Sequence, residues 1–214
     1  HLLYLDTIDD RYKLIPINEN MKPFKVAIIF SGLERSLANS SYNLRVDECK
    51  AAAYELKGLA NMEYGKFNDT RLRDVPREIF EEYKSYLPVN WYRRALHFYD
   101  ENERVMLGVQ AWKDGDLDKF GKLIFESGYS SIYNYETGSE ELRALYEIMT
   151  NTDGIYGGRF SGAGFKGFCM ALIDPEKEES IKENITQEYL NRFPLLKDRF
   201  SIHICEISNG VELK

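Results

Sequence analysis

The sequence predicts an α+β fold, a ferredoxin-like split βαβ sheet with additional helices inserted in the first crossover. The order of the apolar patterns supports this: a strand-like run precedes a long helical middle, and two further strands, a helix and a last strand follow. The composition supports it as well, because 43% hydrophobic residues in a chain of 214 can form a core and exclude a disordered or fibrous protein.

The N-terminal residues are expected to form strands. Leu2–Leu5 and Leu14–Ile17 are short apolar runs on either side of a polar turn, a pattern typical of a hairpin. Phe24–Phe30 is a continuous run of β-branched and aromatic residues, as in a strand buried on both faces. We therefore expect residues 1–23 to form a leading segment and residues 24–214 to form the main domain.

Helical spacing predominates in the middle of the chain. Apolar residues within 49–56 recur at i, i+3, i+4 and i+7, one face of a helix that Asn43 is expected to cap. Pro76 is expected to open a short helix at its first turn, and Pro88 is expected to stop it. A longer helix follows and is expected to end near Asp114-Gly115.

Capping residues mark the next two helices. Asp116 is expected to cap a helix that ends at Gly128. Ser139 is expected to start the second helix, because a side-chain cap and the two glutamates after it both suit a helix N-terminus. The buried stripe of this helix has the clearest helical spacing in the chain and consists of Leu142, Leu145, Tyr146 and Met149.

The C-terminal third is expected to complete the sheet. Tyr156–Phe160 and Phe168–Ile173 are predicted strands on either side of a glycine-rich connection. Asp174-Pro175, a cap followed by proline, is expected to begin a helix. Phe200–Ile207 alternates with a period of two, which predicts the final strand.

Charge and cysteine content argue against several classes of protein. A net charge of −7 argues against nucleic acid as a partner. No apolar stretch in the sequence approaches the roughly 18 residues that a membrane span requires. The widely spaced Cys49, Cys169 and Cys205 are expected to be buried free thiols of a cytoplasmic protein.

Other polar residues receive structural interpretations. His97 and His203 are expected to be satisfied core or edge residues, and no spacing of histidine and cysteine fits a zinc site, so no metal ligand is assigned. Arg93-Arg94 near Trp91 has the charge of an anion site, but a solvated helix start is the preferred interpretation.

The segment richest in chemical information is Gly157–Gly167, which contains five glycines between two predicted strands. Glycine permits positive φ and close approach of the backbone, so successive exposed N–H groups can form a concave anion site. A tight hairpin with a bulge is the alternative interpretation. The segment is not a Walker A motif, because no Gly-Lys-Ser/Thr follows at the required spacing.

Arg159–Gly167 (RFSGAGFKG), followed by an apolar strand, resembles the third conserved motif of the galactokinase, homoserine kinase, mevalonate kinase and phosphomevalonate kinase (GHMP) family. Two further strings resemble motifs of the same family and occur in the right order. Phe30–Cys49 resembles a galactokinase stretch with a Tyr-Asn-x-Arg core, and Tyr135-Glu136 resembles a family Tyr-Glu pair. The strings that look like plant-type galacturonokinases are Tyr42–Val46, Ala111-Trp112 with Phe120–Ile124, Ser130–Glu136 and Arg159–Phe165.

The resemblance implies an ATP-dependent sugar-1-kinase acting on the anomeric hydroxyl of galactose or galacturonate. In that family two lobes meet at a cleft, and the N-terminal lobe supplies the phosphate loop, the Mg²⁺ ligands, the catalytic aspartate and most sugar contacts. This sequence has none of those motifs and begins inside a strand-like run, so we expect the C-terminal lobe of a longer protein. ATP and Mg²⁺ would then be bound mainly by the N-terminal lobe, and no catalytic residue is assigned here.

The resemblance carries over to a few residues. Tyr42 matches the tyrosine whose hydroxyl hydrogen-bonds the sugar, a contact that serves specificity. Gly162, Ala163 and Gly164 match the glycine loop that abuts the ATP-phosphate loop, so they are assigned a supporting role at the nucleotide. Lys166 joins them, either assisting a phosphate or uronate carboxylate or lying solvated on a turn.

Three alternatives stay open at this point. The same family includes kinases of other acceptors, such as a heptose, another sugar or mevalonate. A non-catalytic, galactokinase-like sugar sensor would share these motifs. A free-standing α+β binding module with fortuitous glycines is the third alternative.

Overall fold

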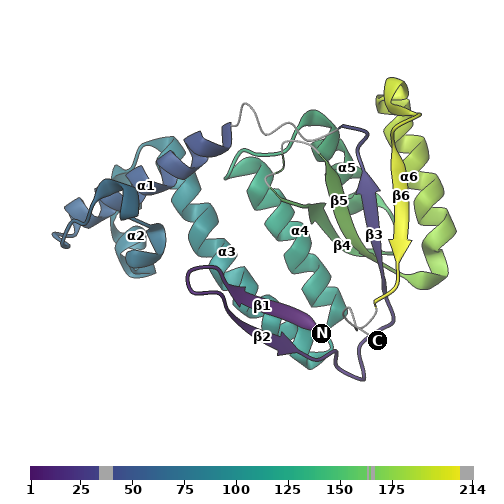
Figure 1. The fold of residues 1–214 in the computed structure, drawn as a ribbon, viewed down its shortest axis with the longest axis horizontal. Coiled ribbons are helices and arrows are strands. Elements are labelled where there is room, and N and C mark those ends of the chain that lie inside the picture. Colours follow the sequence, from purple (N-terminus) through teal and green to yellow (C-terminus); the bar gives the residue numbers. More distant parts are fainter. Residues whose placement is uncertain (34–40, 163, 165–166, 208–214) are drawn as a thin grey trace, which may run out of the picture. The chain divides into compact units, whose positions relative to one another are not determined.

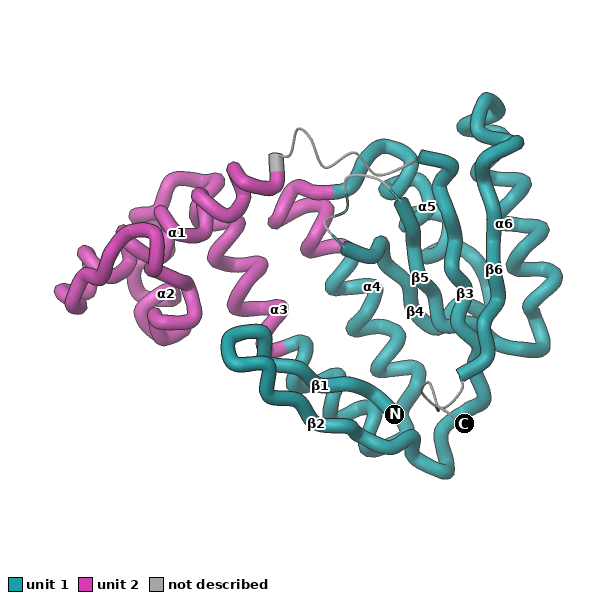
Figure 2. Tube along the Cα trace, viewed as in Figure 1, with its two compact units in different colours: residues 1–35, 104–128, 138–214 teal, residues 36–103, 129–137 magenta. Residues whose placement is uncertain are grey.

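The computed structural model describes residues 1–33, 41–162, 164 and 167–207 (Figure 1). The chain divides into two compact units, each assembled from segments that are far apart in sequence (Figure 2). Unit 1 contains residues 1–35, 104–128 and 138–214, and unit 2 contains residues 36–103 and 129–137.

An antiparallel sheet organises unit 1. Its strands are β3 (Lys25–Phe30), β4 (Ile155–Phe160), β5 (Phe168–Ile173) and β6 (Ser201–Cys205), in the order β4-β5-β3-β6. Each neighbouring pair is antiparallel, so β3 and β4 run parallel to each other with β5 between them. This is the split βαβ arrangement, and the predicted fold class is confirmed.

Two helices pack together on the sheet of unit 1. They are α5 (Glu140–Asn151) and α6 (Glu178–Arg192), which lie behind the strands in Figure 1. The amide of Leu142 donates a hydrogen bond to the Ser139 hydroxyl, which confirms the predicted cap of α5. The predicted stripe of α5 is buried, and so are Ile181, Ile185 and Tyr189 of α6.

A smaller hairpin also belongs to unit 1. β1 (Leu2–Asp6) pairs antiparallel with β2 (Arg11–Ile15), with Leu2 opposite Ile15. The predicted hairpin is present, but its second strand begins at Arg11, before the apolar run 14–17, and ends at Ile15. The indole of Trp112 donates a hydrogen bond of 3.0 Å to the carbonyl of Pro16, so the segment after the hairpin is tied to a helix of the same unit.

Unit 2 is helical. Its elements include α1 (Ser41–Leu59), α2 (Arg77–Tyr83) and the first part of α3 (Val89–Asp114). Apolar side chains of α1, α2 and α3 share one core, and the Tyr99 hydroxyl donates to the carbonyls of Leu72 and Val75. The short 3₁₀ turns of the two units are Phe67–Asp69, Leu72–Asp74, Lys84–Tyr86, Pro175–Lys177 and Pro194–Leu196.

Two of the predicted helix ends are wrong. Asn43 lies inside α1 and does not cap it, because the helix already includes Ser41. Gly128 does not end the next helix, since α4 (Leu117–Tyr133) continues through it. A Cβ at position 128 would lie 2.5 Å from the ring of Tyr146, so this glycine makes room for packing and is not a helix end.

The cysteines are free, as predicted, although only Cys169 is fully buried and the thiols of Cys49 and Cys205 are half-buried. Across the helices that the structure describes, no segment has both the length and the apolarity needed to cross a bilayer.

Helix α4 approaches β4 at backbone distance in unit 1. A Cβ at Gly121 would lie 2.0 Å from the Tyr156 carbonyl oxygen, and one at Gly157 would lie 2.2 Å from the Gly121 carbonyl oxygen. Only glycine at both positions allows this contact. The contact brings Ile124, one turn further along α4, next to the sheet.

Gly121→Ala is expected to destabilise the protein, because the added Cβ meets backbone that cannot shift without moving β4. We expect the free energy of unfolding to fall by about 1–3 kcal/mol. The control is Gly108→Ala on α3, whose Cβ would meet only the Phe120 ring at 3.5 Å and which should be neutral or stabilising by up to about 1 kcal/mol. Urea unfolding measures both variants, and equal stabilities would contradict the close contact.

Candidate functional site

The glycine-rich segment forms a bend between β4 and β5. Gly162, Gly164 and Gly167 have φ angles of 73°, 76° and 111°, in the region that side chains rarely adopt. A Cβ at Gly164 would also lie 2.3 Å from the Phe160 ring. Ala163 and Lys166, which were assigned to nucleotide support, lie outside the described residues, so their role stays a prediction.

Backbone hydrogen bonds hold this bend to three elements of unit 1. The Ser161 amide donates to the Phe168 carbonyl at 2.9 Å, closing the β4–β5 connection. The Ser139 amide donates to the Gly164 carbonyl at 3.0 Å, and the Ser31 amide donates to the Gly167 carbonyl at 2.9 Å. Gly164 and Gly167 are therefore fixed against the start of α5 and the end of β3.

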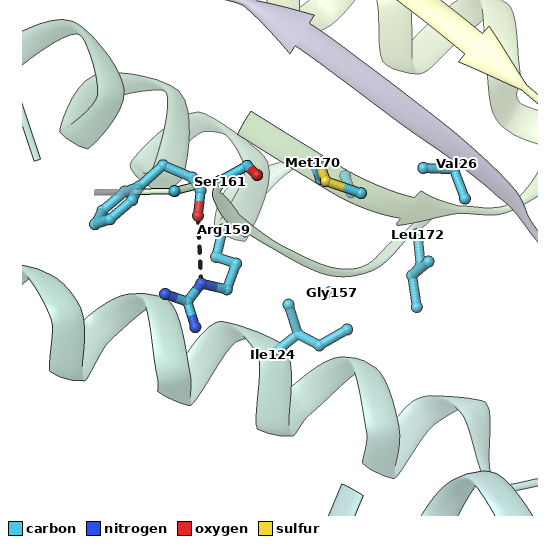
Figure 3. Close-up of a pocket in the computed structure, with 10 residues that line it drawn as sticks. Val26, Ile124, Gly157, Arg159, Ser161, Met170 and Leu172 are labelled. Atoms are coloured by element: carbon cyan, nitrogen blue, oxygen red, sulfur yellow. Dashed lines mark hydrogen bonds between the residues drawn. The ribbon is translucent and has the colours of Figure 1, made fainter. Parts of the chain in front are cut away.

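A pocket with a volume of about 380 Å³ lies beside the bend, on the side of the sheet that faces α4 (Figure 3). Most of its walls are apolar, and one guanidinium, that of Arg159, adds positive charge. Arg159 Nε donates to the Phe160 carbonyl at 3.3 Å, and its Nη1 donates to the Ser127 hydroxyl on α4. Its lining includes Ile124, Gly157, Arg159, Gly162, Met170 and Leu172.

Tyr42, the predicted sugar-binding residue, lies in the first turn of α1 in unit 2, and 44% of its surface is exposed. Burial raises the pKa of Tyr135, and the charges of Cys49 and Tyr42 raise it further. Burial also raises the pKa of the Cys49 thiol to about 11. The Tyr135 ring packs on His97, with centroids 4.8 Å apart. Tyr42 thus has an accessible side chain at the start of α1.

The same unit contains a buried cluster of charges. Arg94 of α3 has no exposed surface, and its Nε donates to Glu48 Oε2 at 2.6 Å. Its Nη2 donates to Glu136 Oε2 at 2.7 Å, and its Nη1 donates to the Asn134 carbonyl. The interpretation of Arg93-Arg94 as a solvated helix start is therefore wrong for Arg94, because acidic partners from α1 and from the segment after α4 cover it.

Glu136 is the carboxylate that joins the cluster together. Arg94, Arg93 and Arg45 all lie within ion-pair distance of it, at 2.7, 2.7 and 3.5 Å. The hydrogen bond from Arg94 is the main reason that the pKa of Glu136 is lowered, with Arg93 and Arg45 adding to the effect. Its φ of 56° places it in the left-handed region, so the segment after α4 turns sharply at this residue.

The sequence analysis did not predict this charged cluster, although it named the segments that contain its members. Glu48 and Glu136 each belong to a string that resembles the family motifs. No helical spacing links Arg94 to them, because they are 46 and 42 residues away in the chain. The available signal was the pair of adjacent arginines within residues 91–99, where most of the other side chains are aromatic or aliphatic.

The remaining polar residues considered are His97 and the candidate metal ligands. His97 Nδ1 lies 2.9 Å from the Ser130 hydroxyl, consistent with the structural role that was expected for it. Among the residues that the structure describes, no three His, Cys, Asp or Glu side chains gather closely enough to hold a metal ion.

Comparison with known proteins agrees with the sequence motifs. Residues 109–191 match the family model described as "GHMP kinases C terminal". The chain is 39% identical to the galacturonokinase of Arabidopsis thaliana, over 99% of this chain and 50% of that protein. It is 32% identical to the galactokinase of Ligilactobacillus salivarius, over 99% of this chain and 51% of that protein.

A solved structure has the same fold. The galactokinase of Lactococcus lactis, in complex with galactose, matches with a TM-score of 0.81 and 25% identity, over 97% of this chain and 51% of that one. The chain thus spans about half the length of the relatives it matches. The resemblance stated from the motifs is confirmed.

Glu136→Gln is expected to lower stability at neutral pH and to make stability less sensitive to acid. Because the folded-state pKa of Glu136 is lowered, its contribution is present above the unfolded pKa and is lost as the pH falls through the folded pKa. Removing the charge should cost about 1.5–3 kcal/mol at neutral pH, the usual value for hydrogen bonds to charged groups.

Urea unfolding at neutral pH and at about pH 4 tests this dependence. The control is Glu55→Gln, which changes an exposed glutamate on α1 of the same unit. A Glu136→Gln protein whose stability falls with acid as steeply as that of the unmodified protein would contradict the role of this carboxylate.

Proposed function

We propose that this chain, which carries the C-terminal domain of the GHMP kinases, is the C-terminal lobe of a sugar-1-kinase. The reaction is phosphoryl transfer from ATP to the anomeric hydroxyl of galactose or galacturonate. The observation that carries the proposal is the match over nearly the whole chain to a galacturonokinase and to galactokinases, and the string RFSGAGFKG, which resembles the family's third motif, supports it.

At the nucleotide, the bend has a supporting role. Positive φ at Gly162 and Gly164 lets the backbone turn, and neither glycine has a side chain, so a phosphate loop of the other lobe can approach these two residues closely. The hydrogen bonds to Ser139 and Ser31 hold the bend in place before ATP arrives. Such preorganised backbone dipoles stabilise transferring charge without having to reorganise.

At the sugar, Tyr42 supplies a hydroxyl. The side chain is accessible, and α1 is anchored close to it by buried groups. A site that hydrogen-bonds a substrate hydroxyl disfavours analogues that lack it, so the tyrosine contributes to specificity. The named relatives act on galacturonate and galactose, and we propose these two sugars for this lobe.

The remaining partners follow from the two-lobe arrangement. We propose that residues 24–214 form the C-terminal domain and that residues 1–23 lead into it from an N-terminal lobe, which supplies the catalytic residues and holds ATP and Mg²⁺. Free thiols and the use of ATP fit a cytoplasmic enzyme.

Sugar-dependent ADP release tests the function. The chain should be inactive by itself with ATP, Mg²⁺ and either sugar. When it is fused to the half of the Arabidopsis thaliana galacturonokinase that it does not match, the fusion should release ADP with galacturonate or galactose. Enzyme-like turnover by the chain alone would contradict the lobe assignment. A folded fusion that turns over only mevalonate or a heptose would contradict the sugar assignment.

Tyr42→Phe in that fusion should raise the KM for the sugar about tenfold while leaving the KM for ATP unchanged, because one hydrogen bond is worth about 1 kcal/mol or slightly more. Tyr86→Phe, at a tyrosine that is 68% exposed, is the matched control and should change neither constant. Steady-state kinetics with each substrate varied separately gives the answer. An unchanged sugar KM in Tyr42→Phe would show that the hydroxyl does not contact the sugar.

A further inference from the structure

Arg94 has a feature that sugar and nucleotide binding do not explain. It is a charged side chain with no exposed surface, and its fork of N–H donors joins α3 to two other segments of unit 2. Its Nε reaches Glu48 on α1 at 2.6 Å, while its Nη2 reaches Glu136 after α4 at 2.7 Å. Moving a charged group out of water is unfavourable, so a buried arginine has to be compensated by charged and hydrogen-bonding partners.

The bonds from Arg94 lead to the start of α1. Glu48 Oε2 also accepts a hydrogen bond of 2.9 Å from Arg45 Nη1, and Arg45 lies three residues after Tyr42 on the same helix. Residues three apart lie on the same side of a helix. The second terminal nitrogen of Arg45, Nη2, donates to the Glu136 carbonyl at 3.4 Å. The first two turns of α1 are thus tied twice to the segment around Glu136.

Tyr135 adds a packing contact at the same place. It precedes Glu136 in the chain, and its ring packs on His97 of α3. The turn at Glu136 is therefore held to α3 by an ion pair and by a ring contact. Tyr42 lies one helical turn before Arg45, which donates to the Glu136 carbonyl, so a movement of this turn is passed on to the start of α1.

The energetics favour a positional role over a stabilising one. Buried ion pairs contribute little net stability, since their desolvation offsets much of their attraction. Their bonds are directional, however, and the planar guanidinium fixes the angle between two acceptors in a way that an ammonium group does not. An arginine that bridges two carboxylates from different segments therefore sets their separation.

We propose that Arg94 is a positioning residue that holds Glu48 and Glu136 together and thereby fixes the first turn of α1 and the side chain of Tyr42. The inference rests on the proposed function only in its consequence, which is that sugar affinity depends on Arg94. The orientation of Tyr42 itself is a property of this chain and can be measured without any substrate.

The test places 3-fluorotyrosine at position 42 of the 214-residue chain and records its ¹⁹F spectrum. The unmodified chain should give one signal displaced from that of the unfolded chain. In Arg94→Met and in Arg94→Lys the signal should move toward the unfolded position and broaden. Lysine keeps the charge but not the fork, so full rescue by lysine would overturn the proposal, as would an unchanged signal in Arg94→Met.

Arg77→Met is the matched control. Arg77 also pairs with several carboxylates, but its partners Glu81, Asp100 and Glu103 lie on α2 and α3. Its removal should lower stability while leaving the ¹⁹F signal of position 42 in place. If Arg77→Met shifts the signal as far as Arg94→Met does, the effect is general loosening of unit 2 and the proposal fails.

Kinetics of the fused enzyme separates this proposal from the proposed function. Arg94→Lys should raise the KM for the sugar at least fivefold with an unchanged KM for ATP. A ¹⁹F shift in the variants together with no sugar turnover by any fusion supports the positioning role and counts against the kinase function. Normal sugar kinetics in Arg94→Lys together with an unmoved ¹⁹F signal leaves the kinase function standing and refutes the positioning role.

Discussion

The pairing of β3 along both of its edges is the constraint on which unit 1 depends. Ala27 and Ile29 are fully buried in this strand, and its backbone bonds to β5 on one side and β6 on the other. A slip of one residue would turn every side chain to the wrong face, so the register is strongly specified. Because Phe30 is opposite Phe168, the glycine bend has to end where β3 ends, and the Ser31 amide meets the Gly167 carbonyl there.

Most of the fold could be predicted, because its signals are local. Continuous apolar runs predicted β3 and β5, and a serine before two glutamates predicted the start of α5. The errors came where a distant contact outweighs a local preference. Gly128 has the residue type of a helix end, but the ring of Tyr146 occupies the space that its missing side chain leaves. Nothing in the neighbouring sequence indicates that ring.

The candidate site divides in the same way. Glycine content was enough to predict the bend, since positive φ is a property of single residues. The charged cluster could not be predicted, because adjacent arginines indicate a solvated surface unless their partners are known. Those partners approach from α1 and from the turn at Glu136, which only the folded chain brings together. Because Arg94 is buried between these partners, it positions two carboxylates and does not contribute to a solvated surface.

The reactivity of the Cys169 thiol reports on local opening of the core of unit 1. The thiol lies on β5, opposite Ile29 of β3 and Phe160 of β4, and burial raises its pKa and keeps it protonated. Its sulfur lies 3.9 Å from the Leu142 carbonyl of α5, so an alkylating reagent can reach it only when α5 moves off the sheet, and a protonated thiol reacts slowly even then. The rate at which this sulfur is modified therefore records how often α5 separates from the sheet in an otherwise folded molecule.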